Sequence, residues 1–129
     1  MLSRIVTLKE CGRLYDRLRS RYFLCAEAPL HIPPPSSEIT LSWLPDNTDA
    51  LAITYFDEDG DPFEMRFNAK FFRYCIAYET ILHELTHIRL GAIPSCGAFS
   101  HAWRGGRVAR SMAWHRETVR LAQAGAIRL

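Results

Sequence analysis

The feature that most restricts the fold of this chain is a long apolar segment, residues 68–91. Its large apolar side chains recur at helical spacing and cover much of the circumference: Phe71, Phe72, Cys75, Ile76, Ile81, Leu82, Leu85 and Ile88. A helix that is apolar on most sides is normally buried, so other elements must pack around it. Asn68 is a suitable N-cap and Gly91 a suitable C-terminal stop. We therefore expect a central helix over residues 68–91.

The chain before this helix predicts one further helix and a small sheet. A capping-box pattern at Thr7 and Glu10 begins a helix expected over residues 7–23. Three strand-like runs follow, separated by turns rich in aspartate and asparagine. They span residues 39–44, 50–56 and 62–67. Short turns between consecutive runs favour a three-stranded antiparallel meander.

Alternation along these runs gives each strand an apolar face. The alternating residues are Ile39, Leu41 and Trp43, then Leu51, Ile53 and Tyr55, then Phe63, Met65 and Phe67. A last helix is expected over residues 102–124, with Val108, Met112 and Val119 as its buried edge. The fold class is therefore α+β: an N-terminal helix, a three-stranded antiparallel sheet, a central helix and a C-terminal helix.

Composition agrees with a single folded domain over residues 1–129. Hydrophobic residues make up 48% and charged residues 23% of the chain, which excludes a disordered tail or a collagen-like chain. No apolar run approaches the ~20 residues of a membrane helix, and the N-terminus lacks the apolar core of a secretory signal. We expect a cytoplasmic or nucleoid-associated protein with no membrane partner. Its four cysteines are then buried thiols rather than disulfides.

The charge is unevenly distributed around a net value of +2. Residues 1–22 and 104–129 are rich in arginine, whereas residues 23–69 are acidic. The basic ends suit either the solvated faces of terminal helices or a surface that binds nucleic acid.

The central helix contains the sequence His83-Glu84-Leu85-Thr86-His87. Histidines four residues apart lie on one helical face, so that both imidazoles can bind one metal ion. Glu84 lies about 100° round the helix from His83, where it can take a proton from a metal-bound water. Zinc lowers the pKa of such a water toward ~7. The motif predicts a zinc site with His83 and His87 as ligands and Glu84 as the catalytic base.

A catalytic zinc needs a third protein ligand and an open position. We expect His101 to be this ligand, because the preceding loop, residues 91–101, contains glycine and proline and can turn back toward the metal. Cys96 is a rival, since thiolates also bind zinc. Glu79, one turn before His83, could orient that histidine.

These residues resemble a known family, the SprT-like zincin metallopeptidases, which include the Spartan-type proteases acting on DNA–protein crosslinks. The similar segments are Glu79-Thr80-Ile81-Leu82-His83-Glu84-Leu85-Thr86-His87 and Ser100-His101-Ala102-Trp103. The family pattern is Leu-Leu-His-Glu-x-x-His, followed by Gly-His-Gly-x-x-Phe/Trp; here Ser100 and Ala102 replace the glycines and Trp103 comes sooner.

The resemblance implies a single SprT-like metallopeptidase domain over residues 1–129 with a zincin-like fold. It implies Zn²⁺ bound by His83, His87 and His101, with Glu84 as base. The activity would be hydrolysis of peptide bonds in a protein or peptide substrate. Recruitment to DNA-bound proteins would use nucleic-acid contacts of the basic terminal helices.

Two alternatives remain open at the level of sequence. One is an ImmA/IrrE-like peptidase that cleaves a repressor, suggested by Leu90-Gly91 directly after the motif. The other is a non-catalytic, metal-stabilised binding module, with Cys96 completing the ligand set. Glu84 favours catalysis, because a purely structural zinc site needs no base. Three residues are candidates for stabilising the oxyanion: Tyr55, Tyr78 and His115.

Overall fold

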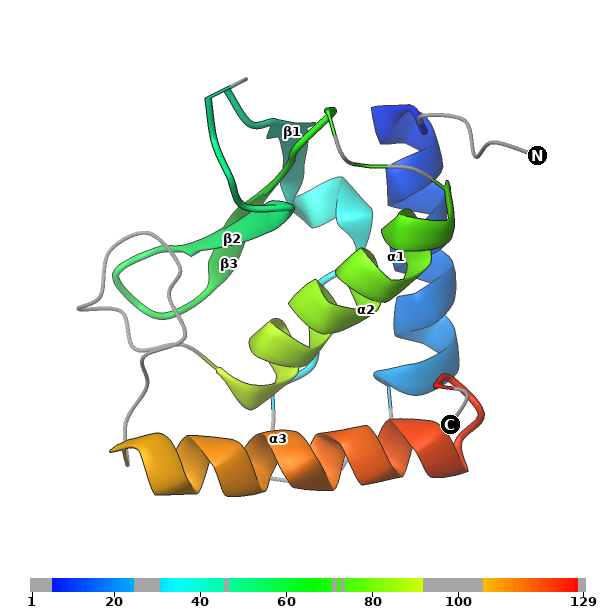
Figure 1. Ribbon diagram of the computed structural model, residues 1–129. Helices are drawn as coiled ribbons and strands as arrows, with labels where there is room; N and C mark the ends of the chain where they lie inside the picture. The colour runs from blue at the N-terminus through cyan, green and yellow to red at the C-terminus, as the bar shows by residue number, and fades with distance from the viewer. Residues whose placement is uncertain are drawn as a thin grey trace.

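The computed structural model describes residues 6–24, 31–45, 47–70, 72, 74–91 and 106–127, with the backbone alone for residues 74, 75 and 106–113. In chain order the elements are α1 (Leu8–Tyr22), the 3₁₀ helix η1 (Ser36–Glu38), β1 (Thr40–Trp43), β2 (Ala52–Phe56), β3 (Pro62–Phe67), α2 (Tyr74–Leu90) and α3 (Gly106–Gln123). The fold is α+β, as expected. Helix α2 lies between the sheet and α1, and α3 crosses one end of this arrangement (Figure 1). None of the helices in the described ranges combines the length and apolar character needed to cross a membrane.

Helix α1 begins with the predicted capping box. The Thr7 hydroxyl accepts a hydrogen bond from the Glu10 backbone N–H at 3.1 Å, and the Thr7 N–H donates to the Glu10 carboxylate at 3.3 Å. The buried face of α1 consists of Cys11, Leu14, Tyr15, Leu18 and Tyr22. Cys11 is a free thiol, as expected, and burial raises its pKa to about 12.

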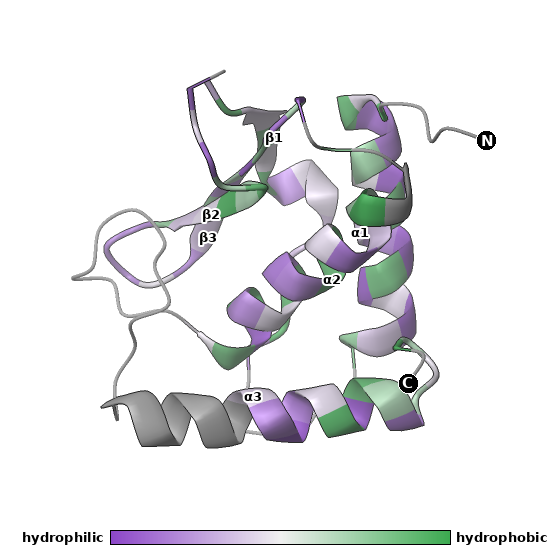
Figure 2. Cartoon of the chain, in the orientation of Figure 1, coloured by the Kyte–Doolittle hydropathy of each residue, from purple (hydrophilic) through white to green (hydrophobic). Residues whose placement is uncertain are grey.

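The sheet is mixed, so the prediction of an antiparallel meander is wrong. Its strand order is β1-β3-β2: β2 and β3 form the expected antiparallel hairpin, but β1 pairs with the other edge of β3 and runs parallel to it. The tip of this hairpin is hydrophilic (Figure 2). Asp57 stabilises the turn there, because its carboxylate accepts hydrogen bonds from the backbone N–H groups of Asp59 and Asp61. Strand β3 lies at the centre, paired with β1 on one edge and β2 on the other, and its side chains Met65 and Phe67 are fully buried.

Asn68 has a different role from the predicted N-cap of the central helix. Its side-chain amide donates to the carbonyls of Thr48 and Ala50, at 2.6 and 3.1 Å, and thereby holds the segment that leads from β1 to β2. That segment crosses over β3 instead of turning back beside β1, which explains the parallel pairing. The other end of α2 is as predicted, because Gly91 has φ +84° and follows the last helical residue.

The side chains of β2 that are buried are not the alternating apolar ones that the sequence predicts, but those on the opposite face of the strand. Thr54 and Phe56 are buried, whereas Leu51 is exposed and Ile53 and Tyr55 are only half-buried. The register with β3 sets this orientation, since Thr54 stands opposite the buried Met65. The pairing shifts at Tyr55/Phe56, and Phe63 beyond this irregularity is 48% exposed.

Helix α3 is attached through a buried carboxylate. Glu117 Oε1 lies 2.9 Å from Arg89 Nε of α2, and the guanidinium of Arg120 donates to Glu117 at 3.0–3.1 Å. Arg120 also donates a hydrogen bond to the Tyr22 carbonyl of α1 at 2.7 Å. Glu117 and Arg120 together therefore attach α3 to both α2 and α1. The prediction that Val119 lies on the buried edge of α3 is wrong, because Val119 is 40% exposed. The side chains of Val108 and Met112 lie outside the described residues.

Replacing Glu117 by glutamine should destabilise the protein strongly. The E117Q variant removes the negative charge beside the buried Arg89 while keeping the side chain's shape. We expect the free energy of unfolding, measured by urea titration, to fall by about 3 kcal/mol. The control E58Q, at an exposed position in the hairpin turn, should change it by less than about 0.5 kcal/mol. Equal stability of E117Q and E58Q would show that the ion pairs contribute nothing.

Candidate metal centre

The two motif histidines converge as the sequence predicts. Their Nε2 atoms lie 2.9 Å apart, and the ring planes are nearly perpendicular, at 85°. Two imidazoles bound to one tetrahedral zinc would place these atoms about 3.3 Å apart, given Zn–N bonds of ~2.05 Å. The His87 ring is buried and the His83 side chain is 47% exposed, so the pair is accessible from the His83 side.

Glu84 lies beside this pair inside the core. The residue is 3% exposed, and its Oε2 is 4.0 Å from His83 Nε2. Thr54, at the middle of β2, donates its hydroxyl to Glu84 Oε1 at 2.7 Å. Burial raises the pKa of the Glu84 carboxyl to about 7, although hydrogen bonds from the hydroxyl and backbone of Thr54 oppose this shift. A carboxyl group of this kind can accept or donate a proton near neutral pH.

Trp114 of α3 packs against both histidines. Its ring is stacked on His83, with centroids 5.0 Å apart and an angle of 29°, and meets His87 edge-on at 4.6 Å. The indole therefore restricts rotation of both imidazoles. Glu117 is one turn further along α3, so the ion pair with Arg89 also fixes the position of Trp114.

Sequence reasoning did not single out Thr54 or Trp114. Nothing in the alternation of β2 marks a threonine as a partner of a carboxylate 30 residues away. Trp114, one turn before Glu117 in the last helix, carries no sequence signal that would connect it to the motif. Both residues become recognisable only through their contacts with the motif.

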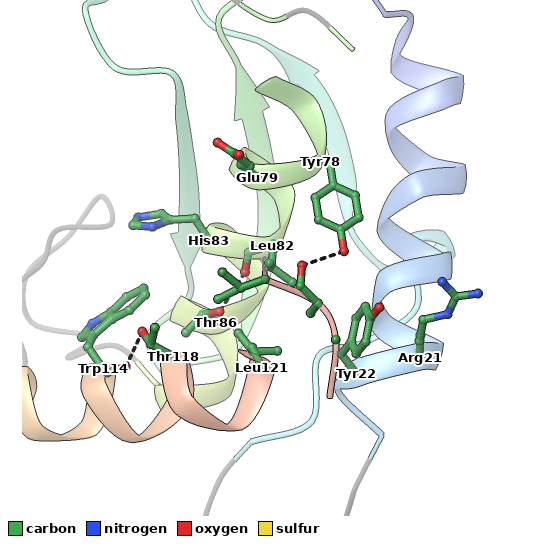
Figure 3. A pocket seen from close by; sticks show the side chains of 13 residues that line it. Arg21, Tyr22, Tyr78, Glu79, Leu82, His83, Thr86, Trp114, Thr118 and Leu121 are labelled. Carbon is green, nitrogen blue, oxygen red and sulfur yellow. Dashed lines mark hydrogen bonds between the residues drawn. The ribbon is translucent and has the colours of Figure 1, made fainter. Parts of the chain in front are cut away.

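The other sequence candidates are placed as follows. His101 and Cys96 lie outside the described residues. His115 is exposed on α3. Glu79 is exposed on the same side of α2 as His83 (Figure 3).

The two tyrosines suggested as oxyanion partners have other contacts. Tyr55 lies on the outer face of the sheet, with the Arg66 guanidinium 4.9 Å from its ring centroid. The hydroxyl of Tyr78 donates to the Ala126 carbonyl at 2.9 Å.

The donor atoms of His83, Glu84 and His87 all lie within 4.8 Å of one another, which suits a divalent metal ion. Imidazole nitrogens with an adjacent carboxylate suit zinc and other divalent first-row metals. Comparison of the chain with protein-family models, with curated proteins and with solved structures found no match. The functional assignment therefore rests on the motif and on this geometry.

The bond between Thr54 and Glu84 can be tested by a substitution that preserves shape. T54V removes the hydroxyl from a fully buried side chain, and T86V makes the same change where the hydroxyl donates only to the Leu82 carbonyl within α2. At pH 8, where Glu84 is largely ionised, we expect T54V to lower the free energy of unfolding by about 2 kcal/mol. T86V should cost less than about 1 kcal/mol. Equal losses in urea unfolding of the metal-free variants would contradict a special role for Thr54.

Proposed function

We propose that this chain is a zinc-dependent endopeptidase of the SprT-like zincin type. His83 and His87 are the proposed zinc ligands, together with His101, and Glu84 is the proposed catalytic base. The observation that supports this most is the convergence of two imidazole Nε2 atoms beside a buried carboxyl group on one helix. A structural zinc site would have no use for that carboxyl, which favours catalysis over a metal-stabilised binding module.

A zinc ion held by His83 and His87 would supply a Lewis acid and would lower the pKa of a water molecule. Glu84 would take a proton from the attacking water and later donate it to the amine nitrogen that leaves when the peptide C–N bond breaks. Thr54 holds Oε1 of Glu84, so that Oε2 is the oxygen nearer to His83. The water oxygen forms a new C–O bond to the carbonyl carbon as the C–N bond breaks. The products are a carboxylic acid and an amine, the acid passes its proton to the amine to give a carboxylate and an ammonium group, and Glu84 regains its starting state.

The sheet offers a place for an extended substrate. Strand β2 is an edge of the sheet, and Thr54 at its middle contacts Glu84. A peptide that adds to this edge as a further strand would pass close to the base. This arrangement suits an endopeptidase, because an edge strand binds a chain through its backbone and requires neither terminus.

The proposal predicts different defects for two substitutions. E84Q should reduce cleavage of an unfolded protein such as casein at least about a hundredfold and keep about one zinc per chain. H87A should lose both the zinc and the activity, because it removes a ligand. The control E38Q alters an exposed carboxylate away from the motif and should match the wild type.

Cleavage is measured with a fluorescent substrate, and zinc by elemental mass spectrometry. Full activity of E84Q would exclude the mechanism, and zinc retention by H87A would exclude the ligand set.

We also propose that helix α1 recruits the enzyme to nucleic acid. Lys9, Arg13, Arg17 and Arg21 follow one another at four-residue spacing along α1, and the three arginines are exposed. Such a row presents positive charge along one side of the helix, where phosphates of a single strand can bind. Recruitment of this kind would direct cleavage to proteins bound to DNA.

This second proposal predicts salt-dependent binding of single-stranded DNA. The R13Q/R17Q variant should reduce the slope of log K against log salt concentration by about 1.4, since two phosphate contacts are lost. K70Q removes an exposed charge outside α1 and should leave the slope unchanged. Fluorescence anisotropy at several salt concentrations gives both slopes. Binding that does not vary with salt, or an unchanged slope in R13Q/R17Q, would exclude recruitment through α1.

A further inference from the structure

A cavity of about 850 Å³ lies beside His83, between α2, α3, the end of α1 and the segment after α3. His83 and Trp114 stand at one end, and Tyr22 stands at the other (Figure 3). The segment after α3 closes one side, because the Tyr78 hydroxyl donates to the Ala126 carbonyl at 2.9 Å. The volume is within the range of ~300–1,000 Å³ that is typical of ligand pockets.

The lining of this cavity combines apolar side chains with hydroxyl groups and exposed charges. Four hydroxyl groups line it, and three of them donate their protons to backbone carbonyls: Tyr78 to Ala126, Thr86 to Leu82, and Thr118 to Trp114. Arg21 and Glu79 are the charged side chains among the described lining residues, and both are exposed. Leu82, Leu121, Ile127 and the Trp114 ring give the cavity an apolar surface on which an apolar group is stabilised.

We infer that this cavity binds a large apolar side chain of the substrate, on the residue directly beside the cleaved peptide bond. His83 is part of the cavity wall and also one of the converging imidazoles, so the cavity is continuous with the proposed catalytic centre. A peptide whose carbonyl lies at that centre can place its neighbouring side chain against Trp114 and Leu121. The inference rests on the proposed peptidase function and adds the substrate class: chains with leucine, isoleucine, methionine or phenylalanine at one fixed position.

The experiment compares a variant that fills the cavity with a matched control. Thr118 lines the cavity and is exposed at its edge, so T118F adds a ring there. Val119 is the next residue of α3, is exposed and does not line the cavity, so V119F adds a ring outside it. Circular dichroism and zinc content check that both variants are folded and loaded.

The readout is the affinity of the zinc-loaded chain for two peptide hydroxamates that differ only in a leucine or an alanine side chain. By calorimetry, the wild type and V119F should bind the leucine compound at least about tenfold more tightly than the alanine compound. In T118F the two affinities should become equal. Equal affinities in the wild type, or an undiminished preference in T118F, would overturn the inference.

Cleavage-site sequencing of a digested protein mixture separates this inference from the function on which it rests. Wild-type cleavage next to large apolar residues supports both. Cleavage with no such preference overturns the inference and leaves the peptidase function intact. A chain that distinguishes the hydroxamates but cleaves nothing refutes the peptidase function, while the cavity stays an apolar binding site.

Discussion

The structure depends on how the central helix keeps two ionisable side chains inside the protein. Glu84 is 3% exposed and Arg89 is fully buried, and both belong to α2. A buried charge without polar partners costs several kcal/mol, so each must be matched by a group from elsewhere in the chain. Thr54 of β2 donates a hydrogen bond to Glu84, and Glu117 of α3 forms an ion pair with Arg89. These polar contacts fix where the sheet and the last helix meet α2, which apolar packing alone would leave less specific.

The same contacts assemble the candidate metal centre. The ion pair that attaches α3 also positions Trp114 against both histidines and sets one wall of the cavity beside His83. The bond from β2 holds one oxygen of Glu84 and brings the sheet edge next to the base. Three separate elements therefore contribute to the proposed catalysis: α2 carries the reacting groups, β2 orients the base, and α3 orients the ligands and forms part of the proposed side-chain pocket.

Sequence reasoning succeeded where structure is set by neighbours along the chain. The capping box at Thr7 and Glu10, the hairpin tip and the stop at Gly91 are local, and all are present. It failed where distant segments compete for one surface. The parallel pairing of β1 with β3 depends on how the chain crosses to β2, which Asn68 fixes through carbonyls about 20 residues before it. Val119 was placed on the buried edge of α3 by its apolarity, although burial there follows the charged contact of Glu117.

By itself the sequence determined that His83, Glu84 and His87 share one turn of a mostly buried helix, because helical geometry fixes the separation of residues four apart. Only the tertiary structure decided that Glu84 is buried, that Thr54 and Trp114 contact the motif, and that a cavity adjoins His83. These features join residues far apart in the chain, and periodicity along a sequence carries no information about which distant surfaces will meet.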